Sequence, residues 1–212
     1  MQRVCIFDLD GTLVDSMAYF AKGLLSILDE EGISYDPEEM VGIVTPRGYT
    51  KSAVYYIEEL GVQDTVEHLV HRMEQKLVPA YAEEICLKPF VKEYLQTLKA
   101  QGARLFVLTA SPHIVTDVCL QHNGVYDLFE QVWSVEDFGL SKAGTALFYR
   151  VAEEIGRETA DIEFYDDNLT AVSNAVRAGH KVYGIQDKQS PEDLALIQKR
   201  CHVFVENFKQ LF

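Results

Sequence analysis

Short apolar runs alternate with longer amphipathic segments along most of this chain, and the alternation limits the folds open to it. The runs are rich in β-branched and aromatic residues and occupy Val4–Phe7, Leu105–Leu108, Val132–Trp133, Ile162–Tyr165 and Val182–Ile185. Such runs are typical of strands buried on both faces of a parallel sheet. Helical periodicity between them predicts helices over Pro89–Gln101, Pro112–His122, Ser141–Ile155 and Leu169–Ala178. We therefore expect an α/β fold with a Rossmann-like, doubly wound parallel sheet.

The segment from 16 to 86 departs from this alternation. It follows the first apolar run directly and shows helical periodicity without a further convincing strand. Helices are expected over Tyr19–Glu30, Thr50–Leu60 and Thr65–Val78, with glycines and prolines between and after them. The simplest interpretation is an inserted helical cap domain at 16–86, with 1–15 and 87–212 forming the Rossmann-like core.

Composition restricts the partners that the protein can have. The 212 residues include 19 Lys and Arg against 33 Asp and Glu, a formal net charge of −14. Because nucleic acids and anionic membranes are bound by clustered basic side chains, this balance argues against both as partners. The four cysteines form no CxxC pair, and no apolar stretch approaches the length of a membrane span. We expect a soluble cytoplasmic protein, with a monomer as the default oligomeric state.

Polar side chains follow the apolar runs where the strands are expected to end. They are carboxylates, one hydroxyl and one ammonium: Asp8, Asp10, Thr109, Lys142, Asp166 and Asp167. Lys142 is expected to open the helix after the run at Val132–Trp133. Since open parallel sheets bind ligands beyond the carboxyl ends of their strands, we expect these side chains at one edge of the sheet.

The carboxylates among these residues suit a hard metal ion. Asp8 and Asp167, supported by Asp166 and a backbone carbonyl near Asp10, offer the oxygen ligands that Mg²⁺ prefers. Without a cation, crowded carboxylates repel one another and raise one another's pKa. The sequence therefore predicts Mg²⁺ as the cofactor.

The same group of residues fits phosphoryl transfer. A carboxylate nucleophile beside a second carboxyl that acts as general acid and base can form and hydrolyse an aspartyl-phosphate. Thr109 and backbone N–H groups, for which Gly11 and Ala110 are the candidates, would hold the phosphoryl oxygens. Lys142 would neutralise the charge that builds up on them.

The segment Phe7–Ser16, with the sequence FDLDGTLVDS, resembles the first signature of the haloacid dehalogenase superfamily in its phosphatase form. Three further motifs follow in the family's order: Leu108–Ser111, Lys142 and Phe164–Leu169. The segment from 16 to 86 is similar to the helical cap that phosphoglycolate phosphatase and beta-phosphoglucomutase-like members carry. The chain departs from the family's usual pattern at Ala143, where relatives have proline, and at Asp166, where many have glycine.

The resemblance implies a role for each carboxylate. Asp8 would attack phosphorus, and Asp10 would protonate the leaving oxygen and then activate water. Mg²⁺ would be held by Asp8, the main-chain carbonyl of Asp10 and Asp167, with Asp166 as a further carboxylate near the metal. An aspartate at position 10 speaks against a true dehalogenase, which lacks this acid and base.

Two other residues have competing interpretations. Arg47 lies in a cap turn beside Gly48 and is the best candidate for gripping a substrate anion, although an exposed turn explains it equally well. Ser111, just before Pro112, is expected to cap the following helix rather than to take part in catalysis.

The function expected from these features is Mg²⁺-dependent hydrolysis of a small phosphomonoester, such as a sugar phosphate, phosphoglycolate or a nucleotide monophosphate. A phosphomutase of the beta-phosphoglucomutase type is the alternative within the same chemistry. A non-catalytic binding protein of the same fold is a third possibility. The joint presence of Asp8, Asp10, Lys142 and Asp167 argues against this last interpretation.

Overall fold

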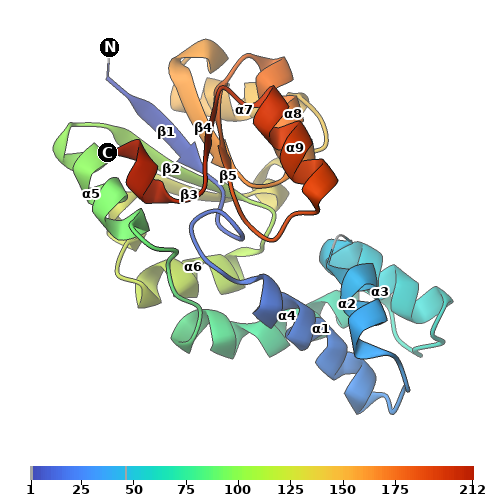
Figure 1. The fold of residues 1–212 in the computed structure, drawn as a ribbon. Helices are drawn as coiled ribbons and strands as arrows, with labels where there is room; N and C mark the ends of the chain where they lie inside the picture. Colours follow the sequence, from blue (N-terminus) through green and yellow to red (C-terminus); the bar gives the residue numbers. More distant parts are fainter. Residues whose placement is uncertain (1, 46) are drawn as a thin grey trace. The chain divides into compact units, whose positions relative to one another are not determined.

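The structure is a computed structural model that describes residues 2–45 and 47–212 (Figure 1). It forms two compact units, one made of the chain up to Asp15 together with Cys86–Phe212, the other of Ser16–Ile85. Cys86 groups with the larger unit, where its carbonyl accepts a hydrogen bond from the N–H of Asp15 (3.4 Å). The smaller unit therefore ends one residue earlier than the expected cap.

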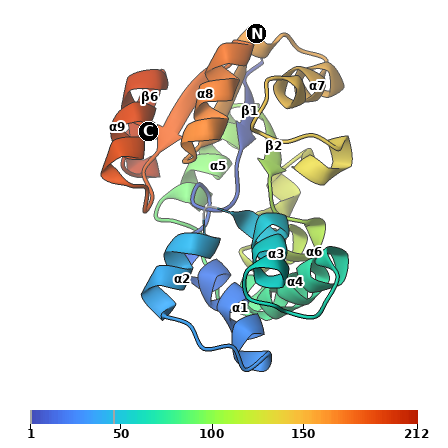
Figure 2. The ribbon, with the colours of Figure 1, turned by 90° about the vertical axis from the view of Figure 1, so that its right-hand side faces the viewer.

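The smaller unit is built from helices (Figure 2). They are α1 (Met17–Glu30), α2 (Pro37–Val44), α3 (Gly48–Glu58) and α4 (Val66–Glu83). The sequence did not predict α2, which begins after Asp36, whose side chain accepts a hydrogen bond from the N–H of Glu39. Helix α4 continues past Pro79, where it was expected to end, and its last turn is anchored by the fully buried Tyr81.

The larger unit contains, within the described part of the chain, a six-stranded parallel sheet in the order β3-β2-β1-β4-β5-β6 (Figure 1). The strands are β1 (Val4–Phe7), β2 (Arg104–Thr109), β3 (Gln131–Ser134), β4 (Ile162–Asp166), β5 (Lys181–Ile185) and β6 (Val203–Val205). Strand β1 is central, with Phe7 opposite Val107 of β2 on one side and Tyr165 of β4 on the other. This order confirms the predicted Rossmann-like α/β fold.

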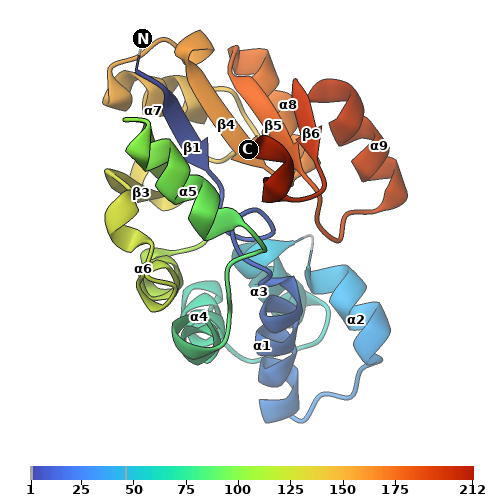
Figure 3. The ribbon, with the colours of Figure 1, turned by 60° about the vertical axis from the view of Figure 1, so that its left-hand side comes forward.

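Helices cover both faces of the sheet (Figure 3). They are α5 (Val91–Ala100), α6 (His113–His122), α7 (Ala146–Ile155), α8 (Leu169–Ala178) and α9 (Pro191–Arg200), with short 3-10 helices η1 (Tyr126–Leu128), η2 (Val135–Phe138), η3 (Thr159–Asp161) and η4 (Phe208–Leu211). Ile6 belongs to a core shared with α7 and α8. On the opposite face Tyr165 stacks on Phe7 (4.4 Å between centroids), and Tyr94 of α5 lies beside it (6.2 Å). The alternation of side chains along β1 thus supplies both cores.

Two parts of the larger unit differ from the predictions. Helix α7 begins at Ala146 rather than at Ser141, because the intervening residues include Gly144 and hydroxyl side chains, which are poor helix formers. The last helix and strand, α9 and β6, were not predicted at all. Strand β6 has three residues and only Val205 is buried, which leaves too little pattern to recognise.

None of the helices in the two described stretches of the chain is long and apolar enough to cross a membrane.

Candidate active site

Three carboxylates converge where the two central strands end. Asp8, Asp166 and Asp167 each place an oxygen within 4.8 Å of the others. Asp8 directly follows β1, and its N–H donates to the carbonyl of Tyr165 in β4 (2.9 Å). The parallel pairing of β1 with β4 therefore brings carboxylates together that lie more than 150 residues apart in the sequence.

Lys142 joins two of these carboxylates. Its ammonium donates to Asp8 Oδ1 (2.5 Å) and to Asp166 Oδ2 (2.8 Å), and its side chain is 12% exposed. Contrary to expectation, Lys142 lies in the loop before α7 rather than in the helix. The loop is attached to α8 through Asn174, whose Nδ2 donates to the carbonyl of Lys142 (3.2 Å).

Burial and the closeness of other negative charges disfavour the ionised form of these carboxyl groups. Burial, with the negative charges of Asp166 and Asp10, raises the pKa of Asp8 to about 7, although Lys142 opposes the shift. Burial and the same kind of repulsion raise the pKa of Asp167 well above its usual range. Conversely, Asp166 and Asp8 raise the pKa of Lys142 despite its burial, so this lysine remains charged.

The carboxylate group fits a divalent cation by its chemistry. All three donors are hard oxygens from aspartates, which is the donor type that Mg²⁺ takes in proteins. Added positive charge relieves the repulsion that raises the pKa of Asp8 and Asp167. The residues present therefore suit Mg²⁺.

The loop after β1 packs directly against Asp167. Gly11 has a φ of +80°, and a Cβ at this position would lie 2.6 Å from Asp167 Oδ2, so that only glycine fits. The hydroxyl of Thr12 donates to Asp167 Oδ1 (3.0 Å). The N–H of Gly11 is bonded to the carbonyl of Val14 (3.0 Å), and Gly11 thus shapes the turn. Thr12 belongs to the first motif but was not predicted as a site residue.

Ser111 contacts the second predicted catalytic carboxylate. Its hydroxyl donates to Asp10 Oδ2 (2.6 Å). Its N–H donates to the hydroxyl oxygen of Thr109 (3.0 Å), which is buried at the end of β2, while Ala110 between them is exposed. The expectation that Ser111 caps the next helix is wrong, because Pro112 is the N-cap of α6 and no side chain caps that helix.

Arg47 belongs to the smaller unit. It is exposed, its Nη1 donates to the carbonyl of Ile43 (2.5 Å), and its guanidinium lies 4.9 Å from the centre of the Tyr55 ring. These contacts hold the guanidinium in one orientation on that unit.

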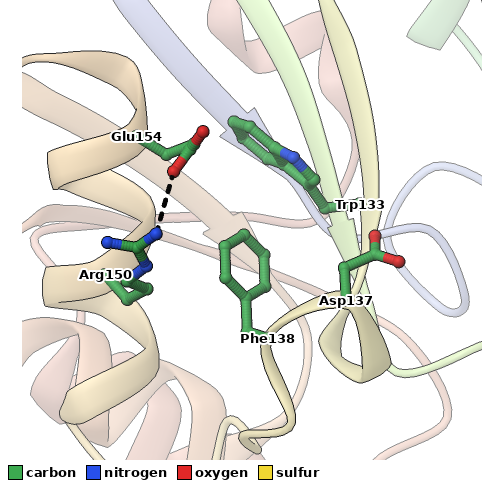
Figure 4. A pocket seen from close by; sticks show the side chains of 5 residues that line it. All are labelled: Trp133, Asp137, Phe138, Arg150 and Glu154. Carbon is green, nitrogen blue, oxygen red and sulfur yellow. Dashed lines mark hydrogen bonds and ion pairs between the residues drawn. The ribbon is translucent and has the colours of Figure 1, made fainter.

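A pocket of about 450 Å³ lies elsewhere in the larger unit, between β3, η2 and α7 (Figure 4). It is lined by Trp133, Asp137, Phe138, Arg150 and Glu154. Its charged groups have partners in the protein, since Arg150 donates to Glu154 (3.3 Å) and Asp137 accepts from the ring of His113 (2.9 Å). No residue of the predicted site lines this pocket.

The parallel sheet, with carboxylates at the ends of its central strands, is a Rossmann-like α/β fold with a candidate active site. A family model of haloacid dehalogenase-like hydrolases matches residues 5–185, a range that includes Asp8, Lys142 and Asp167. The chain belongs to this family, and it is an enzyme of the family's phosphatase type.

Individual relatives agree with this assignment. A phosphoglycolate phosphatase from Haemophilus influenzae is 30% identical over 187 residues, which cover 84% of this chain and 83% of the relative. A 6-phosphogluconate phosphatase from Escherichia coli is 25% identical over 185 residues, covering 84% and 79%. The structure of CbbY from Rhodobacter sphaeroides in complex with phosphate has a TM-score of 0.83 at 16% identity, covering 100% of this chain and 96% of that one. The family predicted from the four motifs is thus confirmed.

Proposed function

We propose that this protein is a Mg²⁺-dependent phosphatase that hydrolyses a small phosphomonoester through an aspartyl-phosphate. The observation that carries the proposal is the placement of the Asp8 carboxylate. It lies at the end of the central strand, bonded to Lys142 and within 4.8 Å of two further carboxylates. A nucleophile in this position is next to both the positive charge and the metal donors that phosphoryl transfer requires.

In the first step Asp8 acts as the nucleophile and Asp10 as the general acid. A carboxylate oxygen of Asp8 bonds to phosphorus while the bond from phosphorus to the ester oxygen breaks. Asp10 gives its proton to that oxygen, which leaves as an alcohol. The two residues are separated only by Leu9, on the loop that Gly11 turns.

In the second step water attacks the phosphorus of the aspartyl-phosphate. Asp10, now ionised, accepts the proton of the water, and phosphate leaves as the Asp8 carboxylate is restored. Thr109 at the end of β2 and the backbone N–H of Ala110, an exposed residue, hold the phosphoryl oxygens. The hydrogen bond from Ser111 to Asp10 Oδ2 orients the carboxylate between the two steps.

Asp8, Asp166 and Asp167, with the main-chain carbonyl of Asp10, would hold the metal. A bound Mg²⁺ supplies positive charge against these carboxylates and against the phosphoryl oxygens. Lys142 provides a fixed positive charge beside Asp8 and Asp166, and this charge opposes the rise in the pKa of Asp8.

The substrate we propose is a small phosphorylated metabolite with a second polar or anionic group. Two relatives are named for phosphoglycolate and 6-phosphogluconate, which are both small anions. In this proposal the unit Ser16–Ile85 serves as the cap that excludes water during the reaction. Arg47, whose guanidinium is oriented by Tyr55 and Ile43, contacts the second group of the substrate.

The test is phosphate release from p-nitrophenyl phosphate and from a panel of phosphoglycolate, 6-phosphogluconate, hexose phosphates and nucleoside monophosphates. We expect turnover with Mg²⁺, none with EDTA, and none in Asp8→Asn, which keeps its circular dichroism spectrum because the change is nearly isosteric. Turnover that persists in Asp8→Asn would contradict the nucleophile assignment.

If the protein is folded and binds Mg²⁺ but releases no phosphate from any ester of the panel, the proposal that it is a hydrolase is contradicted. The same preparation would then be assayed for isomerisation of hexose phosphates, which measures a phosphomutase directly.

A further inference from the structure

We propose that Lys88 and Asp187 are positioning residues that hold the loop carrying Asp10 and Gly11 in its active geometry. The inference rests on the proposed function of the carboxylate site and adds two residues that lie outside the four motifs. Neither residue would touch the substrate or the reacting atoms. They would act through the main chain of Gly11.

The Lys88 ammonium has three partners in the protein. It donates to the carbonyls of Gly11 and Gln186 (3.1 Å to the latter) and forms an ion pair with Asp187 Oδ1 (2.8 Å). The side chains of Lys88 and Asp187 are 13% and 8% exposed, so the pair is largely withdrawn from water.

The adjacent lysine provides a contrast. Lys188 is 62% exposed and makes one ion pair, with Asp15 (2.9 Å), whose side chain is 55% exposed. Surface pairs of this kind contribute little to stability. Lys88 therefore differs from an ordinary surface lysine in burial and in its number of partners.

The carbonyl that Lys88 contacts belongs to Gly11, whose backbone lies against the carboxylate site. Gly11 follows Asp10 directly, and its backbone approaches Asp167 so closely that a Cβ would lie 2.6 Å from Oδ2. A shift of the Gly11 peptide would therefore displace the main chain of Asp10. It would also change the space available to the Asp167 carboxylate. Lys88 thus holds the main chain of Gly11, which lies between Asp10, the general acid of the proposed function, and Asp167, one of its metal ligands.

The loop between β5 and α9 supports both sides of the site. Asp187 in this loop anchors Lys88, while Gln189 in the same loop donates from Nε2 to the carbonyl of Asp167 (2.8 Å). The two residues are joined, because the N–H of Asp187 donates to Gln189 Oε1 (2.7 Å). One loop therefore holds the main chain of Gly11 and the main chain of Asp167.

The role proposed for the pair is geometric, although each charge also acts on the nearby Asp167 carboxylate, in opposite directions. Lys88 and Asp187 carry opposite charges, so together they add no net charge to the carboxylate group. The lysine that contacts the carboxylates is Lys142. A double substitution that removes both charges therefore separates the two explanations.

The experiment compares Lys88→Met, the double variant Lys88→Met with Asp187→Asn, and Lys188→Met as the matched control. Lys88→Met leaves a buried Asp187 without its partner, and the double variant removes that defect. Mg²⁺ affinity is measured by calorimetry, and kcat and KM with p-nitrophenyl phosphate are expressed per folded molecule. Hydrogen exchange of the amides in the Asp10–Val14 loop reports its order without any activity.

We expect both Lys88 variants to bind Mg²⁺ roughly 10- to 100-fold more weakly and to lose kcat by a similar factor, as partners of metal ligands do. KM should change much less, and the loop amides should exchange faster. Lys188→Met should match the wild type. Recovery of wild-type Mg²⁺ affinity and kcat in the double variant would overturn the proposal, since only the charge of Asp187 would then matter.

The calorimetric comparison separates this inference from the proposed function. If the wild type hydrolyses no phosphomonoester, the phosphatase proposal fails, whereas weaker Mg²⁺ binding and faster loop exchange in both Lys88 variants still support the positioning role. Equal Mg²⁺ affinity and equal exchange in all four proteins would refute it, whatever the activity.

Discussion

The hydroxyl of Ser111 donates a 2.6 Å hydrogen bond to Oδ2 of Asp10, linking the end of β2 to the loop after β1. A bond this short to a carboxylate oxygen is typical of a charge-assisted hydrogen bond. It holds one oxygen of Asp10 in place. The second motif thus contributes to the acid and base as well as to phosphoryl binding in the proposed reaction.

Replacement of Ser111 by alanine should lower kcat about tenfold, because Asp10 remains but loses its orientation; removing a general acid altogether costs roughly 10²- to 10⁴-fold. KM for p-nitrophenyl phosphate should stay within about twofold. Ser173→Ala, which removes a hydroxyl bonded to the carbonyl of Leu169 within α8, is the control. An unchanged kcat in Ser111→Ala would show that the bond has no catalytic role.

Mg²⁺ should raise the melting temperature of the wild type, because it binds the folded carboxylate group and stabilises it by about 2.7 kcal/mol at 100 times its dissociation constant. Asp167→Asn removes one donor and should lose most of this increase. Asp161→Asn, in an exposed 3-10 turn, should keep it. Differential scanning fluorimetry with Mg²⁺ or EDTA measures the difference. An equal increase in Asp167→Asn would exclude this aspartate as a ligand.

Phe90 is 41% exposed and has a φ of +68°. This left-handed backbone conformation costs a residue with a Cβ about 1–2 kcal/mol. Phe90→Gly should therefore be more stable than Phe90→Ala by about 1 kcal/mol. At Gln96, an exposed position within α5, the order should reverse, with glycine about 1 kcal/mol less stable than alanine. Urea unfolding of the four variants tests this reversal. If alanine were more stable than glycine at both sites, the backbone of Phe90 would not be strained.

Burial lowers the pKa of His180 to about 4, and its side chain packs against Phe148. Because the folded-state pKa is lower than the unfolded value of 6.5, this histidine contributes stability above pH 6.5 that is lost as the pH falls toward 4. Between pH 7.5 and 4, the free energy of unfolding of the wild type should fall by roughly 3 kcal/mol more than that of His180→Leu. Urea unfolding at the two pH values measures the difference. His122→Gln, at an exposed position, should follow the wild type. Parallel pH profiles for the wild type and His180→Leu would contradict the assignment.

Arg47→Ala should raise KM for a true substrate by at least tenfold while leaving KM for p-nitrophenyl phosphate nearly unchanged, because the aryl ester lacks a second anionic group. Lys51→Ala, in the same exposed turn of helix α3, should affect neither value. Equal increases for both esters would remove Arg47 from substrate recognition.

The parts of the molecule that follow local rules could be predicted from the sequence. Helix Leu169–Ala178 was predicted with its observed bounds, because Asn168 caps its start and Gly179 ends it. The convergence of Asp8, Asp166 and Asp167 followed from their places after buried strands of a parallel sheet. Each of these features depends on a pattern within a few residues.

The features that were missed depend on contacts between distant segments. Lys88 and Asp187 meet although 98 residues separate them, and no local pattern distinguishes Lys88 from other lysines. Ser111 was misread because a serine before a proline fits a helix cap locally, whereas its actual partner, Asp10, lies on another strand end. Sequence patterns gave no information on such pairs.

The central position of β1 has a consequence for synthesis on the ribosome. Val4 pairs with Arg104 on one side and with Ile162 on the other, so both neighbours of the first strand are made long after it. The helices of Ser16–Ile85, by contrast, find their partners within their own segment. Since closing long loops is slow and local contacts form first, the inserted unit can fold on the nascent chain while the first strand waits unpaired. Asp8 therefore meets Asp166 and Asp167 only after the residues of β4 have been made.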